Sequence, residues 1–258
     1  MNYLYLKDYC MKDNFSALAK GYSMYRPYYP AEMIEYVVSF VNERGQALDV
    51  ATGNGQVAIE LSKHFATVYA TDISEKQLLN ATQADNIIYM VERAEQTAFA
   101  ENQFDLITVA QAIHWFDFDA FYKEVNRILK PDGIFAVLGY GVFSTNTDSD
   151  KILMHFYNNI VGPYWDVERK YIDDNYTTIP FPFDEVDVKQ FTNEFTWTFD
   201  QLIGYLETWS AVQHYKNKEE SNPLDLIRDE LKESWEKNDK KVTFPLLLRI
   251  GKISDIRR

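Results

Sequence analysis

The sequence has little cysteine and no cluster of metal-binding side chains. Cys10 is the only cysteine in 258 residues, so no disulfide can form within the chain. The four histidines, His64, His114, His155 and His214, are scattered and match no zinc-binding spacing. We therefore predict a protein with neither an internal cross-link nor a bound metal.

Long apolar runs and excess positive charge are also missing. No stretch approaches the ~20 apolar residues that cross a bilayer, and no signal-type apolar segment begins the chain. These absences predict an intracellular, cytoplasmic protein with no membrane span. A net charge of −13 disfavours nucleic acid and anionic membranes as partners, because both would be repelled. A small molecule is the expected partner, and the oligomeric state is left open.

What the sequence does contain is an apolar strand that runs into a glycine turn and a helix. The segment 47–58 reads A-L-D-V-A-T-G-N-G-Q-V-A. Gly53 and Gly55 allow a tight turn that lies close to a ligand, and the following helix points its N-terminal amides at that ligand. Asp49, just before the turn, would oppose the pyrophosphate of NAD and would favour a cationic ligand.

The hydrophobic pattern predicts alternating strands and helices. Strands are expected at 47–50, 67–71, 86–91, 104–110, 133–140, 188–198 and 241–252, with helices after Pro30, after Gly55 and over 118–129. The first five strands alternate with helices, which is typical of an α/β, doubly wound, mostly parallel sheet. The last strand is expected to be antiparallel, and Thr198 and Asn222 are expected to cap further helices.

Polar residues follow three of these strands, at the edge of the sheet where ligands bind. Asp72 ends the second strand about twenty residues after the glycines, a spacing that suits a ribose; capping of the next helix is the alternative. Glu92, Arg93, Ala94 and Glu95 follow the third strand. The fourth leads into A-Q-A-I-H-W-F-D, residues 110–117.

These segments resemble class I S-adenosylmethionine (SAM) methyltransferases. The glycine turn is similar to their motif L-D-x-G-x-G-x-G, with Ala51 at the first glycine position, and A-Q-A-I-H-W-F-D is similar to the fourth-strand segment of those acting on small molecules. The stretch Y-S-M-Y-R-P-Y-Y-P (22–30) is similar to a strap that folds over the methionine end of SAM. The resemblance implies a Rossmann-like fold with seven strands and an aromatic-rich helical cap.

The resemblance also implies roles for individual residues. Arg93 occupies a usually acidic position, so the adenine contact falls to Ala94 or Glu95. His114 and Trp115 would face the methyl group or the acceptor, as the catalytic candidates. The candidate cofactor residues are Tyr22, Arg26, Asp49, Ala51, Thr52, Gly53, Asn54, Gly55, Asp72, Ile73, Ala94, Glu95, Ala110 and Gln111.

Two later segments are similar to the acceptor-covering region of trans-aconitate methyltransferases. They are G-P-Y-W (162–165) and T-W-S-A-V-Q-H-Y-K (208–216). We expect one domain over 1–258, with 1–30 as a strap and with 141–187 and 200–240 as insertions that cover the substrate. The candidate substrate residues are Arg26, Tyr164, Trp165, Arg169, Trp209 and His214, with Lys170 and Lys216 as weaker ones.

The resulting functional hypothesis is a SAM-dependent methyltransferase that O-methylates a carboxylate of a small, trans-aconitate-like acid and releases S-adenosylhomocysteine. An ionised carboxylate needs no general base, whereas a hydroxyl or carbon acceptor needs one, and His114 is then the candidate. Two further alternatives stay open: an NAD-dependent oxidoreductase, and a non-catalytic partner subunit with the SAM fold.

Overall fold

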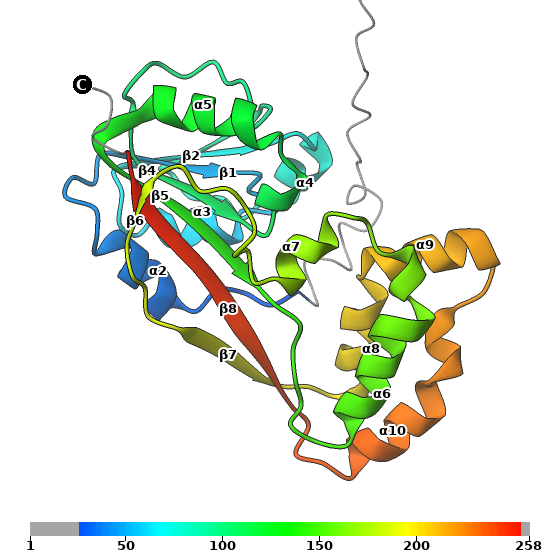
Figure 1. Cartoon of the computed structure of the whole chain (residues 1–258). Helices are drawn as coiled ribbons and strands as arrows, with labels where there is room; N and C mark the ends of the chain where they lie inside the picture. Colours follow the sequence, from blue (N-terminus) through cyan, green and yellow to red (C-terminus); the bar gives the residue numbers. More distant parts are fainter. Residues whose placement is uncertain (1–25, 254–258) are drawn as a thin grey trace, which may run out of the picture.

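An 8-stranded sheet forms the centre of the computed structural model, which describes residues 26–253 (Figure 1). The strand order is β3-β2-β1-β4-β5-β8-β6, and β7 also pairs with β8. Strands β1 to β5 are parallel, and β8 is antiparallel to β5. The strands are β1 (Gln46–Val50), β2 (Thr67–Asp72), β3 (Ile87–Val91), β4 (Phe104–Ala110), β5 (Leu129–Tyr140), β6 (Asp184–Glu185), β7 (Phe191–Thr196) and β8 (Lys241–Lys252).

Helices cover both faces of the sheet because successive strand residues point to opposite sides. Ala47 belongs to the core under α2 and α3, whereas the next residue, Leu48, belongs to the core under α5. Leu106 and Ile107 in β4 divide in the same way. These helices are α2 (Ala31–Val38), α3 (Gln56–Leu61), α4 (Glu75–Leu79) and α5 (Phe118–Ile128).

The remaining α-helices lie to one side of the sheet (Figure 1). In the sequence they come after β5 and before β8. We use "the cap" for α6 (Ser149–His155), the π-helical turn η2 (Phe156–Ile160), the 3₁₀ turns η3 (Gly162–Tyr164) and η4 (Pro223–Leu226), α8 (Phe199–Glu207), α9 (Ser210–Glu219) and α10 (Arg228–Glu236). The short helix α7 (Arg169–Asp173) contacts the 3₁₀ turn η1 (Ile113–Trp115) after β4. Aromatic rings join the cap to the sheet: Tyr205 and Trp197 both contact Phe244 of β8, at 5.4 and 5.7 Å.

The doubly wound α/β sheet predicted from the sequence is confirmed, with differences at its edges. Strands β4 and β8 have the expected bounds, and Thr198 and Asn222 cap helices as expected. Strand β5 begins four residues earlier than predicted, because Leu129 pairs with Phe104 across an irregularity in the ladder. The sheet has one strand more than the seven expected, since the two-residue β6 pairs with the end of β8.

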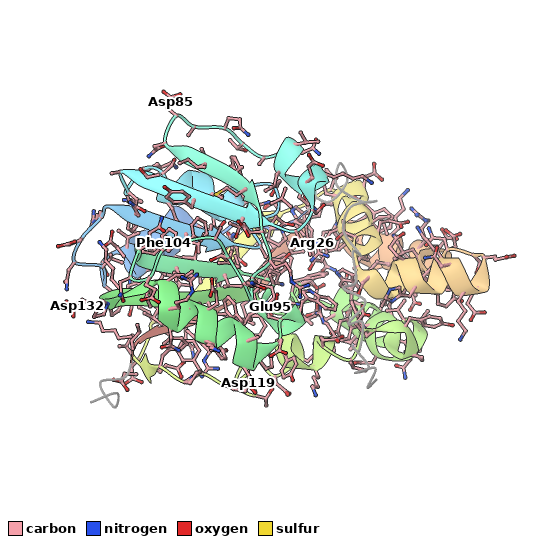
Figure 2. The ribbon with its side chains drawn as sticks, turned by 90° about the horizontal axis from the view of Figure 1, so that it is seen from above. Arg26, Asp85, Glu95, Phe104, Asp119 and Asp132 are labelled. Carbon is pink, nitrogen blue, oxygen red and sulfur yellow. The ribbon has the colours of Figure 1, made fainter. Side chains whose placement is uncertain are left out.

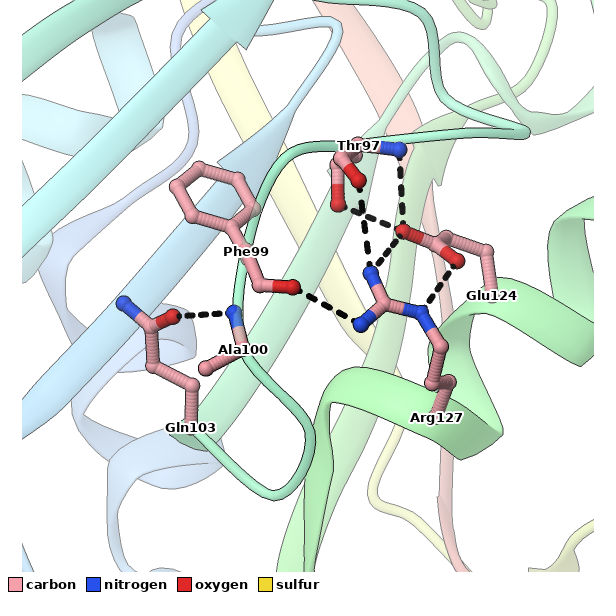
Figure 3. A network of polar contacts seen from close by, with 6 residues as sticks. All are labelled: Thr97, Phe99, Ala100, Gln103, Glu124 and Arg127. Carbon is pink, nitrogen blue, oxygen red and sulfur yellow. Dashed lines mark hydrogen bonds and ion pairs between the residues drawn. The ribbon is translucent and has the colours of Figure 1, made fainter.

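A polar network fixes the loop between β3 and β4 to helix α5 (Figure 3). Glu124 accepts hydrogen bonds from the backbone N of Thr97 (2.9 Å) and from Arg127 (2.6 and 2.8 Å), and Arg127 also donates to the Phe99 carbonyl at 2.7 Å. Burial alone raises the pKa of Glu124, but the hydrogen bonds from Arg127 and Thr97 outweigh it and hold the pKa below its usual value. The network thus anchors the loop that carries residues 92–95.

Candidate functional site

The turn after β1 has the backbone geometry that its sequence predicts. Gly53 and Gly55 have φ values of 58° and 81°, and Ala51 is also left-handed at 53°. A Cβ on Gly53 would meet nothing within 4 Å, so its open side faces free space, as a ligand seat requires. A Cβ on Gly55 would lie 2.3 Å from Oη of Tyr89, so Gly55 serves packing inside the protein. Only Gly53 of the two glycines lines the cavity described below.

Asp49 is a buried carboxylate below this turn. It is 1% exposed, and it accepts hydrogen bonds from Oγ1 of Thr52 (2.5 Å) and Oγ1 of Thr108 (2.8 Å). Burial raises the pKa of Asp49 to about 6; the threonine hydrogen bonds act against this shift, and the charge of Asp72 adds to it. A cation placed beside Asp49 would restore its ionised form.

Asp72 at the end of β2 joins the two neighbouring turns. Its Oδ2 accepts from the backbone N of Gly53 at 2.9 Å, and its Oδ1 accepts from the backbone N of Ser74 at 2.8 Å. Ser74 is the N-cap of α4, and this helix has no side-chain cap hydrogen bond, so Asp72 binds the backbone just before the helix and does not cap it. A carboxylate oxygen has two lone pairs, and Asp72 lines the cavity, so the same group can also accept ribose hydroxyls.

The ends of β3 and β4 supply the opposite wall. Arg93 lies 3.8 Å from Glu95, and Glu95 accepts from the backbone N of Asp117 at 3.4 Å. His114 follows β4 in the turn η1 and is 5% exposed; its ring centroid is 5.0 Å from that of Trp115. Burial, and then the charge of Arg169, lower the pKa of His114 to about 3. His114 is therefore neutral at physiological pH.

These strand ends surround a cavity of about 1060 Å³. Figure 2 shows Arg26 and Glu95, two of its residues, near the middle of the molecule, with Asp85 and Asp132 at the outer edge. The predicted residues that line it are Arg26, Asp49, Ala51, Thr52, Gly53, Asn54, Asp72, Ile73, Ala94, Glu95, Ala110, Gln111, His114 and Trp115. Tyr22 lies outside the described residues.

Most of the predicted substrate residues do not line this cavity. Tyr164, Trp165, Arg169, Trp209 and His214 are absent from its walls, and so are Lys170 and Lys216. Trp209 is 3% exposed and packs 5.5 Å from the rings of both Tyr157 and Trp165. The Tyr164 hydroxyl donates to Glu219, and the Tyr164 carbonyl lies 2.9 Å from Nδ1 of His214.

The cationic candidates among them are likewise bound to protein groups. The Arg169 guanidinium lies 4.5 Å from the Trp165 ring centroid, and its Nε donates to Tyr157 Oη at 2.7 Å. Lys216 pairs with Glu207. The covering segments thus pack mainly against one another, which the sequence pattern does not distinguish from a substrate wall.

The sequence reasoning missed several residues of the cavity. Tyr140 lies at the carboxyl end of β5, where the rule used for the other strands predicts a ligand contact. Glu168 and Tyr171, in and beside α7, carry no such signal, because their position depends on how the insertion folds back. The other missed residues are Pro27, Tyr29, Gln56, Val57, Ser74, Gln77, Glu92, Arg93, Ala112, Phe116, Asp117, Phe118, Asp119 and Pro180.

Residues 26–253 contain neither a cluster placed to bind a metal nor a helix able to span a membrane. No group of three or more His, Cys, Asp or Glu side chains in this range is placed to hold a metal ion. Within the same range, no helix has the length and apolar character needed to cross a bilayer.

Comparisons with known proteins agree on one family. The model of the methyltransferase domain matches residues 48–137. A Dictyostelium discoideum protein named as a methyltransferase is 31% identical over 249 residues, covering 93% of this chain and 95% of the relative. The Saccharomyces cerevisiae protein CRG1, named as an S-adenosylmethionine-dependent methyltransferase, is 23% identical over 82% of this chain and 86% of its own.

A solved structure extends the agreement to three dimensions. A protein of Anaeromyxobacter dehalogenans described as a type II methyltransferase is 33% identical, with a TM-score of 0.81 over 88% of this chain and 97% of that one. The chain belongs to the class I SAM-dependent methyltransferases. It is an enzyme that uses SAM, and the NAD-dependent alternative is set aside.

The residues of the cavity fit SAM. The open side of Gly53 admits a ligand, Asp72 offers acceptors to ribose hydroxyls, and Asp49 offers a carboxylate to a cationic amine. The cavity is also lined by aromatic side chains, which include Trp115 next to His114, Phe116, Phe118 and Tyr171.

Proposed function

We propose that the protein methylates a hydroxyl or amine group on a flat, largely apolar small molecule. Support comes first from the aromatic side chains that line the cavity together with His114, which suit a flat apolar body. It comes second from charge: the cavity is lined by seven carboxylates (Asp49, Asp72, Glu92, Glu95, Asp117, Asp119 and Glu168) and two arginines (Arg26 and Arg93). Such a cavity repels anions.

A carboxylate acceptor, the hypothesis drawn from the sequence, depends on Arg26. Its guanidinium donates to Tyr140 Oη and to the Thr208 carbonyl, both at 3.0 Å, and lies 5.7 Å from the Tyr205 ring centroid. These contacts connect β5 to the cap, which is a structural use of the arginine. O-methylation of a trans-aconitate-like acid stays a prediction, and the charge of the cavity supports a protic acceptor better.

The observation that carries the proposal is the neutral, buried His114 in the cavity wall. With a pKa of about 3 it cannot remove a proton from carbon, but it can accept a hydrogen bond from an O–H or N–H group. When bound, SAM would supply an activated methyl group. The methyl carbon would bond to the acceptor atom as the carbon–sulfur bond breaks, and the electron pair would stay on sulfur, which leaves S-adenosylhomocysteine. His114 would accept the hydrogen bond of the acceptor group and orient it, and the acceptor proton, carried by the positively charged methylated atom, would leave to solvent with the product.

The side chains mainly position the acceptor. A correctly oriented pair of reactants can remove ~7 to 11 kcal/mol of the barrier, and the aromatic wall also excludes water from the reacting atoms. Trp115 adds an aromatic face that can hold a positive charge. A cytoplasmic location and a small-molecule partner stay part of this proposal.

The test is a methyl-transfer screen with matched acceptors. Aromatic compounds that differ only in a hydroxyl, amine or carboxylate substituent would be incubated with SAM, and methylated product measured by mass spectrometry. We expect the wild-type enzyme to methylate the hydroxyl or amine compounds. We expect no methyl transfer by the Asp72→Ala variant. Transfer to carboxylates alone, or no transfer to any hydroxyl or amine compound of a broad panel, would overturn the proposal.

A further inference from the structure

Tyr176 is a buried tyrosine, 0% exposed, whose hydroxyl reaches two polar side chains after β4. Tyr176 and the residue before it, Asn175, both have a left-handed backbone: φ is 61° at Tyr176 and 52° at Asn175. A left-handed backbone costs a residue with a Cβ roughly 1–2 kcal/mol. Such strain persists only where the surrounding structure holds it, and it is common at functional sites.

Neighbouring strands shape the space around this tyrosine. A Cβ on Gly139 of β5 would lie 2.6 Å from Cε2 of Tyr176 and 3.0 Å from Oε1 of Gln111, so only glycine leaves room for both side chains. Arg249 of β8 donates to the Tyr176 carbonyl at 3.1 Å. The ring is therefore fixed from the strand side and from the backbone side.

The orientation of the Gln111 amide follows from its backbone partners. A backbone N–H can only donate and a carbonyl can only accept. The Tyr140 N–H donates to Oε1 of Gln111 at 3.1 Å, and Nε2 of Gln111 donates to the Tyr140 carbonyl at 3.1 Å. Oε1 is therefore the atom that faces Tyr176, at 3.3 Å from its hydroxyl.

This orientation sets the direction of the remaining hydrogen bonds. Because Oε1 of Gln111 accepts only, the single hydroxyl proton of Tyr176 is donated to it. With its proton on Gln111, the Tyr176 oxygen has a lone pair for Nδ1 of His114, 3.2 Å away, and this pairing would place the imidazole proton on Nδ1. In a neutral ring the other nitrogen, Nε2, has no proton and is an acceptor.

We propose that Gln111 and Tyr176 are a positioning pair that holds His114 as the Nδ1–H tautomer and thereby presents the Nε2 lone pair to a protic methyl acceptor. His114 lines the cavity while its Nδ1 edge is turned to Tyr176, and residues 26–253 provide no hydrogen bond to Nε2. An ionised carboxylate has no proton for this lone pair. The acceptor class rests on the function proposed above, whereas the tautomer does not.

The direct test is the tautomer of His114 in the ligand-free, full-length protein. With ¹⁵N-labelled histidine, a long-range ¹H–¹⁵N spectrum distinguishes Nδ1–H from Nε2–H, and His114→Gln assigns the signal among four histidines. We expect Nδ1–H between pH 6 and 8. Finding Nε2–H in the wild-type protein would overturn the proposal, whatever the variants do.

Tyr176→Phe keeps the ring and removes the hydroxyl. We expect the Nε2–H fraction of His114 to rise about five- to tenfold, since one hydrogen bond is worth ~1 to 1.4 kcal/mol. Tyr36→Phe is the control, because its hydroxyl also accepts a hydrogen bond within the protein, from the backbone N of Lys189, and neither residue lines the cavity. An unchanged tautomer in folded Tyr176→Phe would contradict the positioning role.

A kinetic measurement separates positioning from structure. With a protic acceptor from the screen, Tyr176→Phe should lower kcat about tenfold with unchanged SAM affinity, and Tyr36→Phe should leave both within about twofold. A loss of SAM affinity without a loss of kcat would mean that the pair only supports the cofactor pocket. If Nδ1–H is found but only carboxylates are methylated, the proposed acceptor class fails and the tautomer assignment stands.

Discussion

The carboxyl edge of the sheet and the cap both contain predicted site residues, but the protein uses the two sets differently. Asp49, Gly53, Asp72, Gln111 and His114 come from strand ends and all line the cavity. Trp209, Tyr164 and His214 come from the cap and none of them does. From beyond the sheet and its turns the cavity instead receives Glu168, Tyr171 and Pro180, from α7 and its flanks.

The difference lies in what fixes each position. In a parallel sheet, the residues after each strand meet at one edge, so sequence spacing alone predicts which side chains converge. No comparable rule governs the cap. Its aromatic side chains suit a ligand pocket and a hydrophobic core equally, and in this protein they form rings packed on rings, such as Trp209 against Trp165 and Tyr157.

A change in the cap should have the largest effect, and on stability. Trp209 is 3% exposed within the main apolar core, so we expect Trp209→Ala to lower the free energy of unfolding by ~3–5 kcal/mol. Urea denaturation would measure it, with the exposed Leu226→Ala as control. Unchanged stability together with a raised acceptor KM would show that Trp209 is a substrate contact after all.

A change at the sheet edge should instead affect ligand binding. Asp72→Ala removes the acceptor for ribose hydroxyls and the links to Gly53 and Ser74, so we expect SAM affinity to fall by ~3 kcal/mol, more than 100-fold. Isothermal titration calorimetry would measure it. Asp132→Ala, at the outer edge of the molecule in Figure 2, is the matched control. An equal loss in both variants would remove Asp72 from the cofactor site.

Arg26 belongs to both regions, because it joins Tyr140 of β5 to Thr208 in the cap. For a protic acceptor we expect Arg26→Gln to lower stability by ~1–3 kcal/mol and to change the acceptor KM less than tenfold, as two charge-assisted hydrogen bonds are lost. Thermal unfolding and steady-state kinetics would measure both effects, with Arg228→Gln, which pairs with Asp225 outside the cavity, as control. A KM raised by one to two orders of magnitude would instead support a carboxylate acceptor.

The same contrast explains how much of the protein could be predicted. The strand pattern gave the bounds of β4 and β8, because both are long apolar segments. It could not give β6, which has two residues, or the π-helical turn at Phe156–Ile160. In the site, His114 was found from its motif, but its partner Tyr176 is 62 residues away and meets it only because the insertion folds back.

The smallest expected effect is a dependence of SAM affinity on pH, and it arises from Asp49 at the sheet edge. Its pKa in the ligand-free protein is about 6, because burial disfavours the charge, and a cationic amine beside it favours the ionised form. SAM affinity should therefore be constant above pH 6 and should fall by up to about tenfold per pH unit below it. Asp49→Asn should bind more weakly with a flat profile between pH 5 and 7.

Stability of the ligand-free protein should not follow that profile, because two shifts oppose each other. The raised pKa of Asp49 lets the folded state take up a proton that the unfolded state lacks, so this group adds stability as pH falls from about 6 toward 3.8. The lowered pKa of His114 has the reverse effect: its contribution is complete above pH 6.5 and is lost as pH falls toward 3. Between pH 4 and 6 these two contributions offset each other. Calorimetry should therefore show SAM affinity falling with pH while thermal stability does not fall in parallel. If affinity and stability fell together over this range, global unfolding and not Asp49 would control binding.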